Sequence, residues 1–287
     1  MEEDPWEYKK IFMKKVSCVM TTYRRFTCVE RSIAMFLSQD YEHEKELIVY
    51  NTDVEFPISL DKTFSSFDNI KVINNNIDLK TKNPYNNTSS IRRDAKEFAD
   101  GHYYITWDDD DIFFPWNIRQ CVDGIDRTGK LAWKPAKSFM KNAGHDPQLY
   151  FNYLEASVIV RMDAIKRFGF KNDVTGPEHL GWFEKLSGMN ELSIDEESVP
   201  GYCFYWSDNK EIGGHKQSDA SEFYREDNFE RHKEFTIDYA KRPFTKKSFF
   251  DYLEIHKEFV NALKSLKDSK NDLYQKYIES SINSIEK

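Results

Sequence analysis

Residues 103–116 read YYITWDDDDIFFPW, so four consecutive aspartates, Asp108 to Asp111, lie between two apolar and aromatic runs. Acidic stretches that remain in water normally lie among small polar residues, whereas both flanks of this one favour burial. Crowded carboxylates raise the free energy of one another's ionised forms unless a cation or hydrogen-bond donors compensate. The stretch therefore predicts a strand whose carboxyl end either faces water or holds a metal ion.

Three further apolar segments that end in polar loops also predict buried strands: residues 16–20, 46–50 and 69–73. Amphipathic patterns at 26–37 and 91–99 predict helices between them, the second closed by Gly101 as a C-cap. This alternation predicts an α/β fold, with a mainly parallel central sheet flanked by helices. Ligands bind at the carboxyl ends of the strands in such sheets. The aspartates and the polar loops after the first two strands are therefore expected to converge.

The rest of the chain predicts one more strand at 153–161, a helix from Met162 and a short helix over 178–186. From about residue 219 the sequence is charge-rich, and its apolar residues fall on one helical stripe. We therefore expect a main domain over residues 1–218 and a helical C-terminal extension over residues 219–287.

The composition argues against several classes of protein. The 287-residue chain has a formal net charge of -8, which argues against a non-specific nucleic-acid binder. No apolar run approaches the roughly 18 residues that a membrane-spanning helix needs. The N-terminal residues lack the apolar core of a signal peptide, and the four cysteines form no C-x-x-C pair. We therefore expect a cytoplasmic protein with reduced thiols.

The aspartates suit a hard divalent cation. Mg²⁺ and Mn²⁺ prefer carboxylate oxygens and complete their coordination with water and substrate phosphates. Such an ion offsets negative charge on a diphosphate leaving group. Arg92 and Arg93, on the preceding helix, are expected to add cationic contacts to the same phosphates. The alternative is an acidic loop whose carboxylates only cap turns.

Over roughly residues 15 to 216, the order of these segments resembles the inverting GT-A glycosyltransferases of family 2. The resemblance is carried by VSCVMTTYRR, ELIVYNTD, IRRDAKEFADGHYYITWDDDD, EASVIVRMDAIKRFGF and GPEHLGWFEKL. It implies that the domain over 1–218 binds a nucleotide-sugar and is catalytic. It also implies a metal-binding D-x-D pair of Asp108 and Asp110, with Asp110 as the direct ligand. The residues implied in donor binding are Thr22, Tyr23, Arg25, Asn51, Asp53, Arg92, Arg93, Asp108 and Asp109.

Several positions depart from the family pattern, the first being Thr21, where the family usually has a proline before the Thr-Tyr pair. Asn51 occupies the position of an acidic residue that helps family members to recognise the nucleobase. We expect a UDP-linked donor although this acidic residue is absent. The Glu-Asp pair that supplies the general base is Glu178-His179 in this chain. A carboxylate and a neutral imidazole can both deprotonate an attacking hydroxyl. We expect Glu178 to do so, with His179 as the alternative.

A histidine and a lysine, His215 and Lys216, follow Gly213-Gly214 late in the region of resemblance. Family members often place a histidine in a mobile loop that closes over the diphosphate. The resemblance therefore implies that His215 binds the metal or a phosphate and that Lys216 contacts the donor. The alternative is a flexible surface loop with a lone histidine.

Basic and aromatic residues alternate downstream of the aspartates: Lys130, Trp133, Lys134, Lys137, Phe139 and Lys141. Such a pattern can grip a glycan or a nucleic acid. Some phage-encoded enzymes of similar appearance transfer sugars to hydroxymethylated DNA bases. The simpler interpretation is a solvated helix face.

The sequence thus predicts a hexosyl- or pentosyltransferase that is inverting and depends on Mn²⁺ or Mg²⁺. Its donor is expected to be a UDP-sugar, and its acceptor a hydroxyl on a glycan or on a modified DNA base. A nucleotidyltransferase also places aspartates at a strand end, but the chain shows no Gly-rich phosphate loop. A non-catalytic nucleotide- or sugar-binding protein on the same scaffold is favoured only by the altered Glu178-His179 pair.

Overall fold

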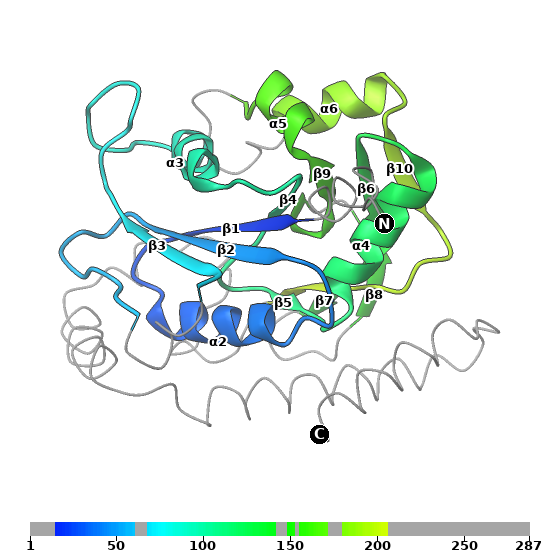
Figure 1. The fold of residues 1–287 in the computed structure, drawn as a ribbon, viewed down its shortest axis with the longest axis horizontal. Coiled ribbons are helices and arrows are strands. Elements are labelled where there is room, and N and C mark those ends of the chain that lie inside the picture. Colours follow the sequence, from blue (N-terminus) through cyan, green and yellow to red (C-terminus); the bar gives the residue numbers. More distant parts are fainter. Residues whose placement is uncertain (1–14, 61–67, 142–147, 153–154, 172–179, 206–287) are drawn as a thin grey trace, which may run out of the picture.

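The computed structural model describes residues 15–60, 68–141, 148–152, 155–171 and 180–205. Its centre is a seven-stranded sheet with helices on both faces (Figure 1). In spatial order the strands of this sheet are β10 (Leu192–Asp195), β6 (Ala132–Pro135), β9 (Ile159–Arg161), β4 (Tyr103–Thr106), β1 (Val16–Thr22), β2 (Lys45–Asn51) and β3 (Ile70–Asn74). The predicted extension over 219–287 and the boundary before it lie outside the described residues.

The strand directions confirm the prediction of a mainly parallel sheet. β1 lies parallel to both β2 and β4, β2 lies parallel to β3, and β6 lies parallel to β10. β9 runs in the opposite direction, antiparallel to both β4 and β6. The strand predicted over 153–161 is shorter than expected, because Glu155–Ser157 form a 3₁₀ turn (η2) before β9 begins.

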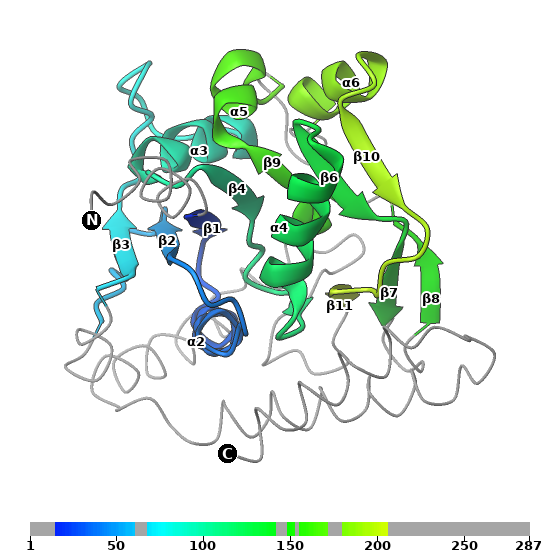
Figure 2. The same ribbon diagram turned by 45° about the vertical axis from the view of Figure 1, so that its right-hand side comes forward.

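A smaller sheet consists of β5 (Ile112–Phe113), β11 (Tyr202–Tyr205), β7 (Lys137–Lys141) and β8 (Gln148–Phe151). Figure 2 shows β7, β8 and β11 together below β6 and β10. The basic and aromatic stretch therefore forms two strands, β6 and β7, and the interpretation as a solvated helix face is wrong. Trp133 and Phe139 belong to the core and Lys134 is buried, whereas the other lysines of the stretch are partly exposed, so the aromatic rings do not lie on the surface beside them.

The helices are α2 (Phe26–Leu37), α3 (Thr88–Ala95), α4 (Asn117–Thr128), α5 (Met162–Phe168) and α6 (Leu180–Gly188). Alternate residues of β1 face opposite sides of the sheet. Val16, Cys18 and Met20 pack in a cluster with α2 and α4, whereas Val19 packs with residues of α3, α5 and α6. Figure 1 shows α2 below the sheet and α3, α5 and α6 above it. The cysteines are buried free thiols, and no helix in the described ranges could cross a membrane.

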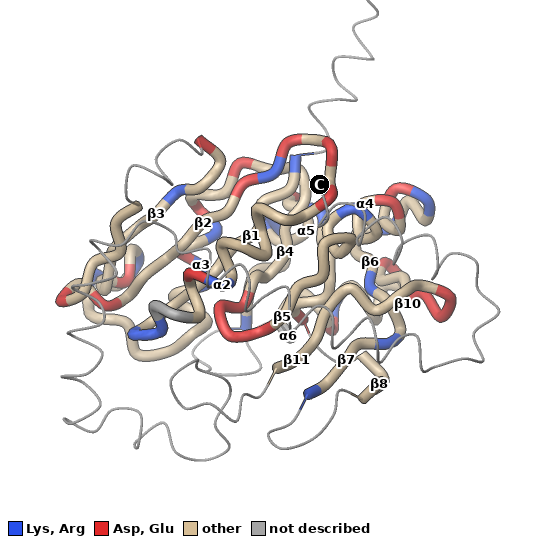
Figure 3. Tube along the Cα trace, turned by 90° about the horizontal axis from the view of Figure 1, so that it is seen from below, with Lys and Arg blue, Asp and Glu red and all other residues tan. Residues whose placement is uncertain are grey.

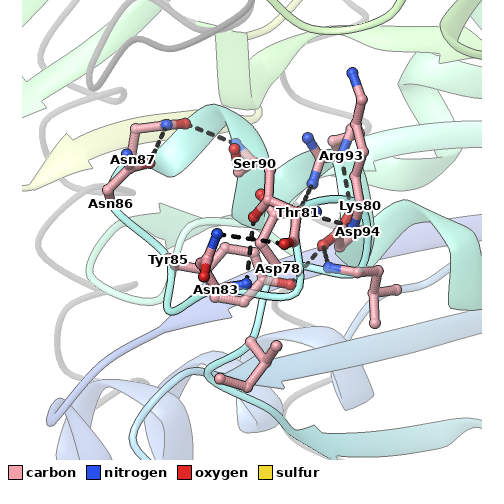
Figure 4. Close-up of polar contacts among 12 residues, drawn as sticks. Asp78, Lys80, Thr81, Asn83, Tyr85, Asn86, Asn87, Ser90, Arg93 and Asp94 are labelled. Carbon is pink, nitrogen blue, oxygen red and sulfur yellow. Dashed lines mark hydrogen bonds and ion pairs between the residues drawn. The ribbon is translucent and has the colours of Figure 1, made fainter.

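A polar network ties the β3–α3 loop to α3 (Figure 4). Asp78 accepts two backbone N–H groups of its own turn at 2.8 Å and pairs with Arg93 at 2.8 Å. Asp94 accepts a hydrogen bond from the Tyr85 hydroxyl at 2.7 Å. At the start of the helix, the Asn87 side chain accepts a hydrogen bond from the backbone nitrogen of its third residue at 2.9 Å, which is an N-cap. These contacts hold α3 in place beside the sheet.

Gly101 is not the predicted C-cap. Helix α3 ends at Ala95 and continues as a 3₁₀ turn, Lys96–Phe98 (η1). Gly101 instead passes so close to β1 that a β-carbon there would lie 2.5 Å from Ser17 Oγ and 2.8 Å from the Ser17 nitrogen. The Gly101 N–H donates to Ser17 Oγ at 2.8 Å, and that hydroxyl donates to the buried Glu46 carboxylate at 2.6 Å. Close approach of two backbones therefore explains the glycine.

We predict that Gly101→Ala lowers the free energy of unfolding by roughly 2 kcal/mol, since β1 cannot move away from a new β-carbon without disturbing the sheet. Gly188→Ala is the control, because this last residue of α6 has open space around its Cα and alanine favours a helix. Urea unfolding of both variants measures the difference. Equal stabilities of the two variants would contradict the close approach at Gly101.

Candidate functional site

The aspartates follow β4 at the edge of the sheet where β1 and β2 also end. Thr22 is paired with Asn51 in the β1–β2 register, and the Trp107 N–H donates to the Val19 carbonyl at 3.0 Å. In Figure 3, one continuous red segment of acidic residues leads into β5. Thr22 Oγ1 donates to Asp109 Oδ2 at 2.6 Å, so the predicted convergence of the loop after β1 with the aspartates is confirmed.

The first three carboxylates of the run have different environments. Asp108 is the most open, with 24% of its side chain exposed, and it accepts a hydrogen bond from Arg92 Nη2 at 2.9 Å. Asp109 and Asp110 are buried and share one guanidinium. Arg25 Nη1 lies 3.1 Å from Asp109 Oδ1 and 2.6 Å from Asp110 Oδ2. The run is therefore not a solvated acidic loop.

Asp111 belongs to the scaffold beneath the site. Its carboxylate accepts hydrogen bonds from the Tyr202 hydroxyl and from the Tyr205 backbone nitrogen, the second at 3.0 Å. Burial raises the pKa of Asp111 well above its usual value, and the neighbouring Asp110 carboxylate adds to the rise. Asp111 thus joins the end of the aspartate run to β11, which comes much later in the chain.

We predict that Asp111→Ala lowers the free energy of unfolding by roughly 3 kcal/mol, because two buried donors lose their acceptor and each costs about 1–3 kcal/mol. Asp111→Asn loses less, since its amide oxygen still accepts one of these hydrogen bonds. Chemical denaturation of both variants checks the order of stabilities. An alanine variant as stable as the wild type would rule out a structural role for this carboxylate.

Asp109 has a shifted titration. Burial raises its pKa to about 6, although the Arg25 guanidinium acts in the opposite direction. An unfolded aspartate titrates at about 3.9, so between about pH 4 and 6 the folded chain binds this proton more tightly than the unfolded chain. Ionised Asp109 therefore lowers the free energy of unfolding above pH 6, and this free energy rises as the pH falls through 6.

In EDTA, we predict that lowering the pH from 7.5 to 5 raises the unfolding free energy of the wild type by roughly 1 kcal/mol relative to Asp109→Asn. The amide variant lacks this titration and is the reference at each pH. Urea unfolding at both pH values gives the comparison. If the two proteins show parallel pH dependence, Asp109 titrates near its ordinary pKa and the assignment is wrong.

Arg31 contributes to the site, although the sequence patterns did not single it out. It is buried on α2, and its Nη2 donates to the backbone oxygen of Asp110 at 2.7 Å. Its guanidinium lies 5.2 Å from the centroid of the Tyr205 ring. The one signal in the sequence is its place among the buried residues of an amphipathic helix, where a charged group needs a partner.

Asn51 and Asp53, both expected to bind the donor, make contacts within the fold. Asn51 Nδ2 donates to the Asp53 carbonyl at 2.9 Å and to Asn74 Oδ1 at 2.8 Å, and Asn51 Oδ1 accepts the Asp53 N–H at 3.0 Å. The Asp53 carboxylate pairs with Arg24 Nε at 2.7 Å. Tyr23 lies beside this pair, 38% exposed, with the Arg24 guanidinium 5.0 Å from its ring centroid.

Arg24, which belongs to the polar loop after the first strand but for which the sequence predicts no role of its own, has a left-handed backbone with φ of 56°. This conformation costs a non-glycine residue on the order of 1 kcal/mol. The ion pairs that Arg24 makes with Asp53 and with Glu55, the latter at 3.1 Å, accompany this strained turn. The turn directs the chain from the end of β1 to Arg25, which holds the aspartates.

The two neighbouring arginines of α3 have different positions. Successive residues of a helix point about 100° apart, so adjacent side chains do not reach the same place. Arg92 contacts Asp108, whereas Arg93 makes ion pairs with Asp78 and Asp94 at 2.8 Å each. The structure therefore brings Arg92 to the aspartates and places Arg93 in the β3–α3 loop network.

Four of the expected site residues lie outside the described residues: Glu178, His179, His215 and Lys216. Their roles stay predictions. Helix α6 begins at Leu180, within the helix predicted over 178–186, and this helix lies on the same face of the sheet as α3.

The residues at the site fit a divalent cation held by oxygen ligands. Negatively charged side chains outnumber positively charged ones around the aspartate run. The carboxylates are those of Asp108, Asp109, Asp110, Asp111 and Glu155, and the guanidinium groups are those of Arg25, Arg31 and Arg92. The described parts of the chain contain no group of three or more His, Cys, Asp or Glu side chains suited to a metal. Mg²⁺ needs only one or two carboxylates when substrate phosphates complete its coordination. The pair that the resemblance implies is Asp108, which is partly open, and Asp110, which is buried and paired with Arg25.

Comparison with known proteins finds solved structures with a similar fold. No protein-family model matches the chain. S. aureus TarS 1–349 in complex with UDP-GlcNAc superposes with a TM-score of 0.52 at 17% identity, over 94% of this chain and 81% of that chain. The UDP complex of TarS 1–349 gives a TM-score of 0.51 at 18% identity, over 66% of this chain and 60% of that chain. In this second superposition the chain spans about 60% of the TarS fragment.

The mannosyltransferase PcManGT from Pyrobaculum calidifontis, in complex with GDP-Man and Mn²⁺, superposes less well, with a TM-score of 0.48 at 14% identity over 94% of this chain and 74% of that chain. The TarS superpositions and the seven-stranded, mainly parallel sheet together define a GT-A glycosyltransferase fold. At 17–18% identity they define the fold only, so the activity has to be argued from the site.

Proposed function

We propose that the chain is a metal-dependent glycosyltransferase that transfers a hexose or pentose from a UDP-sugar to an acceptor hydroxyl with inversion. The aspartate run at the carboxyl end of β4 carries this proposal, because an open Asp108 lies beside the two carboxylates that Arg25 holds. S. aureus TarS, which shares the fold, has been crystallised with UDP and with UDP-GlcNAc. That likeness supports a donor of the same class.

In this proposal, the site residues bind and orient the donor diphosphate. Asp108 and Asp110 would hold Mn²⁺ or Mg²⁺, which when bound offsets the charge of the leaving diphosphate. Arg92 adds a planar guanidinium that suits phosphate oxygens, and it already lies beside Asp108. Tyr23, partly exposed at the end of β1, is the aromatic surface available to a nucleobase.

The remaining roles belong to the residues that the resemblance implied. Inversion requires a base that deprotonates the acceptor hydroxyl as it attacks the anomeric carbon opposite the diphosphate. We assign that base to Glu178, with His179 as the alternative, and we assign closure over the donor to the segment with His215 and Lys216. Membership of family 2, a cytoplasmic location and a catalytic domain over residues 1–218 are part of the same proposal.

For the acceptor, a hydroxyl on a glycan is favoured over one on a hydroxymethylated DNA base. DNA carries dense negative charge and binds mainly to basic surfaces. The chain has a net charge of -8, and the aromatic residues of its basic and aromatic stretch, Trp133 and Phe139, are buried in the core.

We predict that UDP binds in the presence of Mn²⁺ and that EDTA weakens this binding at least tenfold, as measured by titration calorimetry. GDP in the same buffer tests the choice of base. Asp110→Asn should lose the metal-dependent part of the affinity, whereas Asp123→Asn, an exposed change on α4, should bind as the wild type does. If neither nucleotide binds, the aspartates are not a nucleotide-metal site and only the fold is shared.

A second prediction separates catalysis from binding. Glu178→Ala should lower the turnover of a UDP-sugar by at least a hundredfold, because a positioned base contributes about 10²–10⁴ to the rate. The affinity for UDP should stay within about twofold, since the base acts on the acceptor. Release of UDP in the presence of candidate acceptors is the measurement, and His179→Ala is the parallel variant. Unchanged turnover of both variants would show that neither residue is the base, whereas a wild type that binds UDP without any turnover would favour a non-catalytic binding protein.

A further inference from the structure

Glu155, on the turn η2 before β9, makes a long ion pair, beyond hydrogen-bond distance, with the second terminal nitrogen of the Arg92 guanidinium. Arg92 Nη2 contacts Asp108 Oδ1 at 2.9 Å, while Arg92 Nη1 lies 3.9 Å from Glu155 Oε1. The two carboxylates differ in access, because 24% of the Asp108 side chain is exposed and only 6% of that of Glu155. Arg92 is therefore held between one open and one buried carboxylate.

Several contacts keep the Glu155 carboxylate in this position. Thr106, fully buried on β4, donates from Oγ1 to Glu155 Oε1 at 3.0 Å. The turn that carries Glu155 is anchored by Asn152, whose Nδ2 donates to Ser157 Oγ at 2.6 Å and to the Pro135 carbonyl at 2.9 Å. Glu155 thus takes its place from both β4 and the end of β6. A side chain held in this way can orient a neighbour.

We infer that Glu155 is a positioning residue that prevents Arg92 from forming a bidentate pair with Asp108 and so keeps one Asp108 oxygen open to the cation that accompanies the donor. An arginine facing a single carboxylate prefers a bidentate pair in which two of its nitrogens bind the two oxygens. Such a pair would neutralise Asp108 and withdraw Arg92 from phosphate. Glu155 draws Nη1 to the other side, which leaves Asp108 open to a cation. This inference rests on the proposed function, since it takes the cation at Asp108 to be the one that binds the donor diphosphate.

Glu155 could instead serve only as a buried partner for Thr106, and two variants distinguish these roles. Glu155→Gln keeps an oxygen acceptor for the Thr106 hydroxyl but removes the charge that attracts Arg92. Thr106→Val removes the hydroxyl with little change of shape, while the turn that Asn152 anchors still holds the charge of Glu155 near Arg92. If Glu155 acts through Arg92, only the first variant impairs binding of a nucleoside diphosphate.

The test is calorimetric titration of the full chain with UDP in Mn²⁺. We expect Glu155→Gln to raise the Kd about tenfold and Thr106→Val to leave it within about twofold. In an Arg92→Gln background, Glu155→Gln should change the Kd by less than twofold, because its effect passes through Arg92. An unchanged Kd in Glu155→Gln, or an equal further loss in the Arg92→Gln background, would overturn the inference.

Failure of the proposed function gives a different result. If the wild type binds neither UDP nor GDP, the assignment of the donor is wrong. Thermal unfolding then measures the coupling between Glu155 and Arg92. The fall in Tm of the Arg92→Gln, Glu155→Gln double variant should be smaller than the sum of the two single falls. Additive falls in Tm would show that Glu155 does not position Arg92.

Discussion

The bridge from Arg25 to Asp109 and Asp110 is the interaction on which the site depends. Two adjacent carboxylates are buried there, and each would be costly to ionise without a compensating charge. Arg25 supplies that charge from the loop after β1, and Thr22 adds a hydrogen bond from the end of the same strand. Because β1 and β4 are paired in parallel, these groups are brought to the same edge by the sheet itself.

One run of four identical residues is thereby divided among different tasks. Asp111 is bound by Tyr202 and Tyr205 and joins the site to the smaller sheet. Asp109 and Asp110 share Arg25, Asp108 remains partly open beside Arg92, and the proposal gives Asp108 and Asp110 to the metal. The scaffold that surrounds the run, rather than the residue type, determines which carboxylate is available to a ligand.

Much of the fold could be predicted from the sequence, because apolar runs and helical spacing are local signals. The four strands β1 to β4, the helix α2 and the approach of Thr22 to the aspartates all follow from such patterns. The interpretation of residues 130–141 as a solvated helix face is wrong, because a short strand and a helix segment cannot be told apart when apolar and charged residues alternate. Trp133 is buried there, and its indole lies where a β-carbon on Gly124 of α4 would be.

The residues that were missed have partners far away in the chain. Glu155 lies 49 residues from Thr106 and Arg31 lies 79 residues from Asp110, so no local pattern shows why these charges are buried. The prediction of Gly101 as a helix C-cap is wrong for the same reason, because the residue that it approaches, Ser17, lies on β1. Local sequence therefore gave the positions of the strand ends, whereas the charge pairs at those ends required the three-dimensional arrangement.

A crystal structure of the chain with UDP and Mn²⁺, with data collected at the manganese absorption edge, would test the central proposal most directly. We expect one manganese peak at the carboxylates of Asp108 and Asp110, with the diphosphate beside Arg92. A manganese ion bound away from these carboxylates, or a nucleotide bound elsewhere on the chain, would contradict the assignment of this edge of the sheet as the donor site.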